Sequence, residues 1–326
     1  MMRPVRSWLP TLSVALVGLL LAVAALSFGV VAVGCSGTGE QSEDERFHVV
    51  ATTGQLADLV RHVAGERVRL TQIMGAGVDP HLYVAREADS RAFERADMIL
   101  YNGLLLEGRL GDTLRRMGER KPVIAVAEQL PREALLEEPE EDSEAKDPHV
   151  WFDPRLWRHA VDVVAEALTK ALPEQAEAFA EHAVAYQAEL DEAYERLRKQ
   201  VAGIPSQQRV MITAHDAFQY FGRAFDIEVM GIQGMTTEAE AGVQRREQLV
   251  SLIVERRIPA IFIETSVNPQ YVEALVEGAA ARGHRVEIGG ALYSDAMGEP
   301  GTATGTYLGM LTHNVTTIVE ALSKRS

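Results

Sequence analysis

Two copies of one histidine-bearing motif stand far apart in the chain: residues 78–83 read VDPHLY and residues 146–151 read KDPHVW. Proline fixes its own backbone and favours an extended conformation for the aspartate before it, so each histidine belongs to a stiff loop. A stiff imidazole loses little entropy on binding a metal ion, which makes His81 and His149 candidate metal ligands. Taken singly, either histidine is better read as a structural loop residue. The shared design, with an aromatic residue two positions later, favours one common task.

Two more candidate ligands occur in the second half of the chain. His215 follows the run VMITA, and Asp295 lies in the glycine-rich turn GGALYSDAMG, after the strand-like segment RVEIG. Loops at the carboxyl ends of strands are where ligand-binding residues collect in open α/β sheets. Alone, Asp295 would be an ordinary turn or helix-capping residue, and its own sequence context leaves both interpretations open.

Three carboxylates are candidates for a supporting role. Asp79 and Asp147 precede the two Pro-His pairs and could accept the second ring proton of each histidine, which fixes the tautomer of a metal-bound imidazole. Glu264 ends the run PAIFIE. It is interpreted equally well as a supporting carboxylate of the site and as a surface carboxylate at a strand end.

The elements that must position these residues follow a regular pattern. Short β-branched runs alternate with helix-like segments over residues 47–172 and again over residues 204–326, which predicts parallel sheets covered by helices. Residues 173–203 begin with proline, end with glycine and are rich in helix formers, which predicts one long helix. The predicted fold is α/β, with two lobes that each have a central, mainly parallel sheet flanked by helices and are joined by that helix. The helix either limits the lobes to small tilts or is a linker without a mechanical role.

The start of the chain has the features of a secretory signal. Arg3 and Arg6 precede an uncharged, mostly apolar run that ends at Cys35, the only cysteine. The sequence AVGC resembles the lipobox of bacterial lipoproteins, although alanine replaces the usual leucine. We expect residues 1–34 to be a signal peptide and residues 35–46 a flexible tether joined to membrane lipid through Cys35, outside the cytoplasm. An uncleaved membrane helix is the alternative.

The charge balance excludes one class of partner. Acidic residues outnumber basic ones by 47 to 32, which gives a formal net charge of −15. This balance argues against nucleic-acid binding, which requires a basic face. The acidic stretch at residues 131–146 contains no histidine, so it is predicted to be a surface loop rather than a metal-collecting tail.

Several motifs occur together in the order found in one known family. GVDPHLY, DPHVWFDP, TAHDAFQYF, IFIETSVNP and the segment from LYSDAMGEPG onward resemble the zinc and manganese substrate-binding lipoproteins of bacterial ABC importers, over residues 47–326. The resemblance implies that the metal ligands, two from each lobe, are His81, His149, His215 and Asp295. It also implies a transported metal ion, a monomer, and delivery to a membrane permease with its cytoplasmic ATPase.

The donor set restricts the metal. Three imidazoles and one carboxylate suit Zn²⁺ and tolerate Mn²⁺ or Fe²⁺. In the family that the motifs resemble, manganese-binding members often carry glutamate at the position of His215, and zinc-binding members often carry a histidine-rich loop near residues 131–146. This chain has histidine at the first place and an acidic stretch at the second. The two features favour different metals, so the prediction is Zn²⁺ or Mn²⁺.

Two other functions compete with metal import. A secreted zinc-dependent hydrolase could use the three histidines for its metal and Glu264 as general base. The chain lacks the His-Glu-x-x-His helix of zinc proteases and the Gly-x-Ser-x-Gly nucleophile elbow. A surface adhesin lipoprotein would carry matrix-binding or repeat modules, which the sequence does not resemble. Metal capture without covalent chemistry is the leading interpretation, and we expect the protein not to be an enzyme.

Overall fold

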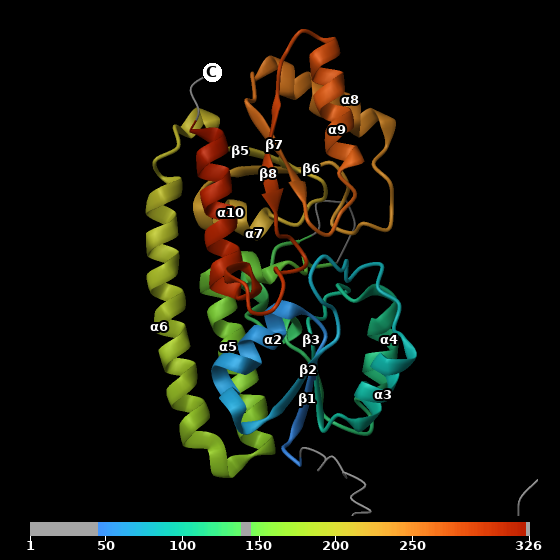
Figure 1. Ribbon diagram of the computed structural model, residues 1–326, viewed down its shortest axis with the longest axis vertical. Helices are drawn as coiled ribbons and strands as arrows, with labels where there is room; N and C mark the ends of the chain where they lie inside the picture. Colours follow the sequence, from blue (N-terminus) through green and yellow to red (C-terminus); the bar gives the residue numbers. More distant parts are fainter. Residues whose placement is uncertain (1–44, 138–144, 324–326) are drawn as a thin grey trace, which may run out of the picture. The chain divides into compact units, whose positions relative to one another are not determined.

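The short β-branched runs form parallel strands, and helices follow them along the chain (Figure 1). The computed structural model describes residues 45–137 and 145–323. The predicted signal peptide, Cys35, most of the tether and the middle of the acidic stretch lie outside the described residues. Within those ranges no helix is both long and apolar enough to cross a membrane.

The N-terminal lobe is built on a four-stranded parallel sheet. Its strands follow the order β2 (Arg69–Gln72), β1 (His48–Ala51), β3 (Met98–Tyr101) and β4 (Val123–Ala125). Each strand is followed by a helix, in chain order α2 (Gly54–Ala64), α3 (Glu87–Arg95), α4 (Gly108–Met117) and α5 (Pro154–Ala171). The parallel sheet predicted from the alternating pattern is therefore confirmed in this lobe.

Helices cover both faces of the central strands of this sheet, and successive strand residues point to opposite sides. Val49 and Ala51 of β1 belong to the main hydrophobic core with α2 and α5. Val50 packs with Phe93 of α3 and Leu114 of α4 in a separate cluster. A parallel sheet covered on both faces needs apolar residues in succession, which is why the central strands β1 and β3 are mostly hydrophobic and fully buried, whereas the edge strand β2 is only partly buried.

The C-terminal lobe has two parallel strand pairs. β5 (Val210–Thr213) pairs with β6 (Glu228–Gly231), β7 (Ala260–Glu264) pairs with β8 (Glu287–Leu292), and β5 lies beside β7. The helices are α7 (Gln219–Phe225), α8 (Val243–Glu255), α9 (Gln270–Ala281) and α10 (Tyr307–Leu322). The predicted parallel direction is present, but among the described strands no hydrogen bonds join the two pairs into one sheet.

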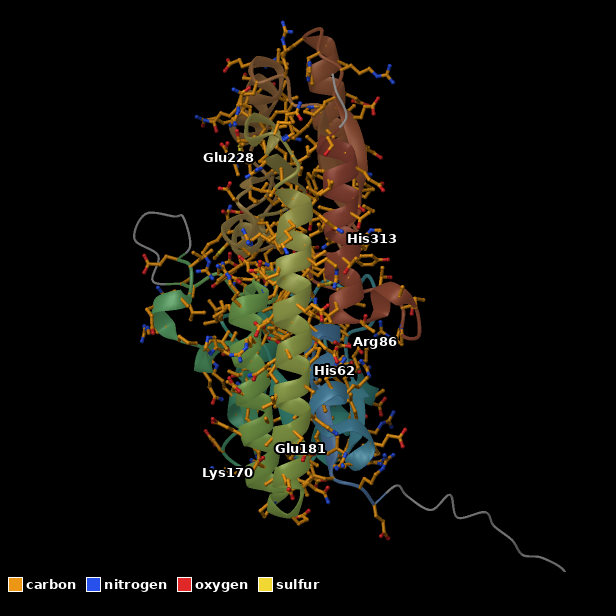
Figure 2. All side chains as sticks on the ribbon, turned by 90° about the vertical axis from the view of Figure 1, so that its left-hand side faces the viewer. His62, Arg86, Lys170, Glu181, Glu228 and His313 are labelled. Carbon is orange, nitrogen blue, oxygen red and sulfur yellow. The ribbon has the colours of Figure 1, made fainter. Side chains whose placement is uncertain are left out.

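One long helix runs alongside both lobes. α6 (Ala176–Val201) has 26 residues, follows a 3-10 turn at Pro173–Gln175, and lies inside the segment predicted to be helical. At about 1.5 Å per residue its length is about 39 Å. It packs against α5 and α2 in the N-terminal lobe and against α10 and α7 in the C-terminal lobe (Figure 2).

The helix α10 makes a second connection between the lobes. Its first residue, Tyr307, is fully buried and stacks on Trp157 of α5 with 5.7 Å between ring centroids. The Tyr307 N–H donates to Asp58 Oδ2 at 3.2 Å, and its hydroxyl donates to the Trp151 carbonyl at 2.7 Å. The division predicted at residue 203 did not anticipate that a segment of the C-terminal lobe would also be part of the N-terminal core.

Asn314 of α10 should contribute strongly to stability. It is fully buried, and its side-chain amide both accepts from the Tyr293 N–H at 2.9 Å and donates to the Tyr293 carbonyl at 2.7 Å. Asn314→Ala leaves two backbone groups without partners, so we expect the free energy of unfolding to fall by about 2–4 kcal/mol in urea titrations. Thr316→Ala on the exposed side of the same helix should change it by less than about 0.5 kcal/mol. Equal effects of the two substitutions would contradict this role.

Candidate metal centre

The structure brings His81, His149, His215 and Asp295 into one buried cluster. His81 lies in the loop after β2, His149 directly precedes the 3-10 turn Val150–Phe152, His215 follows β5, and Asp295 follows β8. One donor atom from each side chain can be chosen so that all lie within 4.8 Å of one another. The four residues predicted from the motifs thus converge from loops that are far apart in the sequence.

The three imidazoles surround a common point. Ring centroids are separated by 5.5 Å between His81 and His149, 5.9 Å between His81 and His215, and 5.3 Å between His149 and His215. The Asp295 carboxylate completes the group, with Oδ1 at 3.4 Å from His149 Nε2 and Oδ2 at 3.2 Å from His215 Nε2. All four side chains are at most 2% exposed.

The donor atoms of this cluster are buried without hydrogen-bond partners. These atoms are both ring nitrogens of His81, Nε2 of His149 and of His215, and both carboxylate oxygens of Asp295. By contrast, a ring nitrogen reaches a backbone carbonyl at 2.8–3.0 Å in each of His62, His182, His284 and His313. A buried polar atom without a partner is costly, and one cation at the centre would coordinate a donor atom of every side chain in the cluster.

Two carboxylates fix the orientation of two imidazoles. Asp147 Oδ1 lies 2.7 Å from His149 Nδ1, and Glu264 Oε2 lies 2.6 Å from His215 Nδ1. Each carboxylate also accepts the backbone N–H of its own histidine at 2.9 Å. A proton held on Nδ1 leaves the Nε2 lone pair free for a metal ion, which is the arrangement that favours ligation.

The corresponding prediction for Asp79 was wrong, because its carboxylate does not reach the His81 ring. Asp79 Oδ1 instead accepts the backbone N–H of His81 at 2.8 Å, a local turn that aspartate readily forms. Its other oxygen accepts the Thr237 hydroxyl at 2.5 Å. Asp79 therefore shapes the backbone of the turn and contacts the C-terminal lobe, while both His81 ring nitrogens are left for other partners.

Several contacts that the sequence did not reveal hold the site loops across the lobes. Trp151 Nε1 donates to the Ser294 carbonyl at 3.1 Å, and Gln55 Nε2 donates to the Asp295 carbonyl at 3.1 Å. The Tyr220 hydroxyl donates to the Asp147 carbonyl at 3.0 Å. Trp151 is the aromatic residue of the second histidine motif, and its indole N–H adds this polar contact to the burial of its ring.

The charges of the metal-free cluster are arranged asymmetrically. Burial alone would lower the pKa of His149, but the Asp147 and Asp295 carboxylates outweigh it and raise that pKa to about 9. Burial lowers the pKa of His81 to about 3, and the neighbouring imidazoles act in the same direction. Burial would raise the pKa of Asp295, yet His215 and His149 hold it well below its usual range. The cluster thus pairs one anionic oxygen ligand with a neutral His81.

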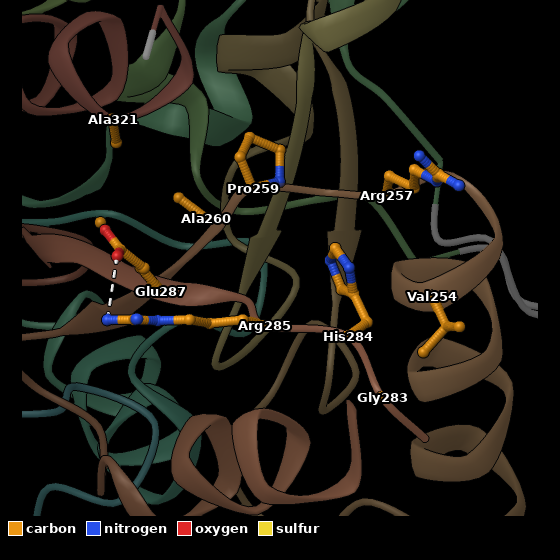
Figure 3. A pocket seen from close by; sticks show the side chains of 10 residues that line it. Val254, Arg257, Pro259, Ala260, Gly283, His284, Arg285, Glu287 and Ala321 are labelled. Atoms are coloured by element: carbon orange, nitrogen blue, oxygen red, sulfur yellow. Dashed lines mark ion pairs between the residues drawn. The ribbon is translucent and has the colours of Figure 1, made fainter. Parts of the chain in front are cut away.

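A cavity elsewhere in the chain lacks such a group of buried donor atoms without partners. About 670 Å³ in volume, it is in the C-terminal lobe near the start of β7 and β8 (Figure 3). In its lining, Arg285 pairs with Glu287 at 3.5 Å, and His284 Nε2 is hydrogen-bonded to the Ile258 carbonyl. Across the described ranges, the four-residue cluster is the one group of three or more His, Cys, Asp or Glu residues that could hold a metal ion.

Comparisons with known proteins point in one direction. Residues 49–321 match the family described as "Zinc-uptake complex component A periplasmic" (ZnuA). The manganese-binding lipoprotein MntA of Bacillus subtilis is 44% identical over 305 residues, covering 94% of this chain and 99% of that protein. The manganese ABC transporter substrate-binding lipoprotein PsaA of Streptococcus mitis is 25% identical over 303 residues, covering 90% and 96%. The structure of the periplasmic zinc binding protein TroA from Treponema pallidum superposes with a TM-score of 0.82 at 44% identity, covering 86% of this chain and 100% of that one.

The histidines of the metal-free chain should titrate far apart. His149 keeps its proton up to about pH 9, so its contribution to stability, complete below the ordinary pKa of 6.5, is lost as the pH rises through about 9. His81 stays neutral down to about pH 3, so stability falls as the pH drops from 6.5 towards 3. Histidine-ring NMR, assigned with His81→Gln and His149→Gln, should show a protonated His149 and a neutral His81 at pH 7.5. Titration of both rings near pH 6.5 would contradict this arrangement.

Proposed function

Because this chain belongs to the ZnuA family of periplasmic zinc-uptake components, we propose that it binds one Zn²⁺ or Mn²⁺ ion through His81, His149, His215 and Asp295. It is the extracytoplasmic substrate-binding protein of a metal ABC importer. The ion is its cargo, which it delivers to the membrane permease that works with a cytoplasmic ATPase. The relatives are named as metal-binding and transport proteins, and they support neither the hydrolase nor the adhesin interpretation.

One observation carries the assignment of the site. Three buried imidazoles and one buried carboxylate point unpartnered donor atoms at one another, and each lobe supplies two of the four residues. Burying these donor atoms without partners costs folding free energy. A divalent cation coordinated by three nitrogens and a carboxylate offsets that cost. We take these four side chains to be the complete set of protein ligands.

The chemistry of the donors and the relatives together define the class of metal. Three imidazoles and a carboxylate form a tetrahedral set suited to Zn²⁺, and intrinsic affinity is higher for Zn²⁺ than for Mn²⁺. One relative is named for manganese and a structural neighbour for zinc, both at 44% identity. A site of this composition therefore binds either ion, and the metal carried in the cell follows its availability as well as its affinity.

The same geometry favours capture over catalysis. Four protein ligands around the ion leave no open position for an activated water molecule, which catalytic zinc sites retain. Glu264, the one candidate general base, is buried and engages His215 through both of its oxygens. Together with the family's role in transport, this supports a binding protein that performs no covalent chemistry.

We propose that Cys35, which lies outside the described residues, carries the lipid that joins the protein to the membrane. The lipoprotein names of the relatives support this, as do the signal-like residues 1–34 before the cysteine. We also propose that the protein acts as a monomer and releases its metal through small lobe tilts. The helices α6 and α10 contact both lobes, and Phe152 stacks on Phe218 between them with 4.4 Å between ring centroids, which opposes wide opening.

Replacing the carboxylate ligand should abolish tight metal retention. Asp295→Asn keeps the size of the side chain but removes the one anionic ligand, so we expect the Kd for Zn²⁺ to rise by at least about a hundredfold. Substitutions outside the ligand set already cost about 10- to 100-fold. Competition titration with a chelating dye measures this change.

Asp216→Asn is the matched control for Asp295→Asn. Asp216 follows His215, accepts a hydrogen bond from Gln219 Nε2 at 2.6 Å, and is outside the cluster. This variant should keep its Zn²⁺ affinity within about threefold, which is below the 10- to 100-fold cost of losing a group that supports a ligand. Retention of wild-type affinity by Asp295→Asn would refute the proposed ligand set, and failure of the parent chain to bind either ion would refute metal capture itself.

A further inference from the structure

Loop 102–108, which follows β3 and includes the first residue of α4, has an unusual backbone. Four of its residues lie in the left-handed region, with φ of 82° at Gly103, 51° at Leu104, 66° at Leu105 and 34° at Gly108. Glycine adopts such angles readily, but two consecutive leucines do not. Backbone strain of this kind persists only where the surroundings hold it in place, and it concentrates at functional sites.

Glu107 is the group that holds this loop. Its fully buried carboxylate accepts the Asn102 N–H at 2.6 Å and the Gly103 N–H at 3.1 Å. It also accepts the Thr52 hydroxyl at 2.8 Å, directly after β1. One carboxylate therefore closes the strained loop on itself and fastens it to the end of a central strand.

The ends of the same loop touch both histidine turns. Asn102 Nδ2 donates to the carbonyl of Pro148, the residue before His149, at 3.0 Å. Gly108 packs so closely on the His81 backbone that a Cβ there would lie 2.6 Å from the His81 carbonyl oxygen. Among the described residues, no hydrogen bond joins the two histidine turns directly. Loop 102–108 contacts both of them and is therefore their common support.

We infer that Glu107 is a positioning residue of the metal site: by fixing loop 102–108, it sets the separation of the His81 and His149 imidazoles. The inference rests on the proposed function, because it assumes that these imidazoles bind a metal ion. Glu107 makes no hydrogen bond to either ring. It acts through the Asn102 contact at one turn and the Gly108 contact at the other, and its effect is to hold the two nitrogen donors in place before the ion arrives.

The test compares two glutamates that bind the same loop. Glu107→Gln removes the charge and turns an amide N–H₂ towards the N–H of either Asn102 or Gly103, because these two groups donate to different carboxylate oxygens. Glu128→Gln is the control, because Glu128 is exposed and accepts only the Leu104 N–H, at 3.3 Å. In the full chain, Glu107→Gln should weaken Zn²⁺ and Co²⁺ binding by about 10- to 100-fold, whereas Glu128→Gln should change it by less than about threefold.

A spectroscopic measurement separates positioning from simple loss of stability. At saturating Co²⁺ the visible d–d bands report ligand geometry, so Glu107→Gln should shift or weaken them while Glu128→Gln leaves them unchanged. If Glu107→Gln does not fold, as judged by circular dichroism, Thr52→Val removes one donor with little change of shape and should alter the bands in the same direction. The inference would be overturned if folded Glu107→Gln, or Thr52→Val in its place, had the Co²⁺ spectrum and the affinity of the parent chain. Failure of the parent chain to bind would instead overturn the proposed function.

Discussion

The proposed site depends on a set of buried donor atoms that have no hydrogen-bond partners among the described residues. Imidazole nitrogens and carboxylate oxygens from both lobes face one another at 3.2–3.4 Å, and these side chains are at most 2% exposed. A proton on His149 offsets part of the free-energy cost of burying these groups, since the carboxylates of Asp147 and Asp295 raise the pKa of His149 to about 9. A metal ion bound as proposed would displace a proton, which would link metal affinity to pH. Because each lobe supplies two of the four side chains, such an ion would also join the lobes.

The rest of the chain limits how far this cluster can change shape. Parallel strands place His81, His215 and Asp295 in loops that follow the carboxyl ends of β2, β5 and β8, and the carboxylates of Asp147 and Glu264 fix two of the rings. The helices α6 and α10, together with a hydrophobic core that runs from one lobe into the other, oppose wide hinge motion. The interactions that remain free to change are single hydrogen bonds between loops, such as Thr237 to Asp79. These contacts support the proposal that the ion enters and leaves through small movements rather than wide opening.

Much of this architecture could be predicted from local pattern. Alternating hydrophobic runs gave the parallel α/β fold, and a proline-to-glycine segment without breaks gave the long helix. The repeated Asp-Pro-His motif, with the resemblance of the other motifs, gave the four residues that the structure brings together. The pairing of Asp147 with His149 could also be predicted from the sequence, because both residues lie in one stiff turn.

The contacts that could not be predicted share one physical cause: the residues that make them are distant in sequence. Asp79 looks like Asp147 in the motif, yet Thr237, 158 residues away, takes up one of its oxygens. Glu107 and Asn102 are ordinary loop residues until the fold places them between the two histidine turns. The dual contacts of α10 arise from the burial of Tyr307 against Trp157, which no periodicity in either helix indicates.

X-ray absorption spectroscopy of the zinc-loaded chain tests the central claim most directly. The account predicts a first shell of nitrogen and oxygen scatterers at about 2.0–2.1 Å, with the multiple-scattering signature of three imidazoles. A shell with one imidazole and several water oxygens, as expected for an ion on the acidic surface, would contradict it.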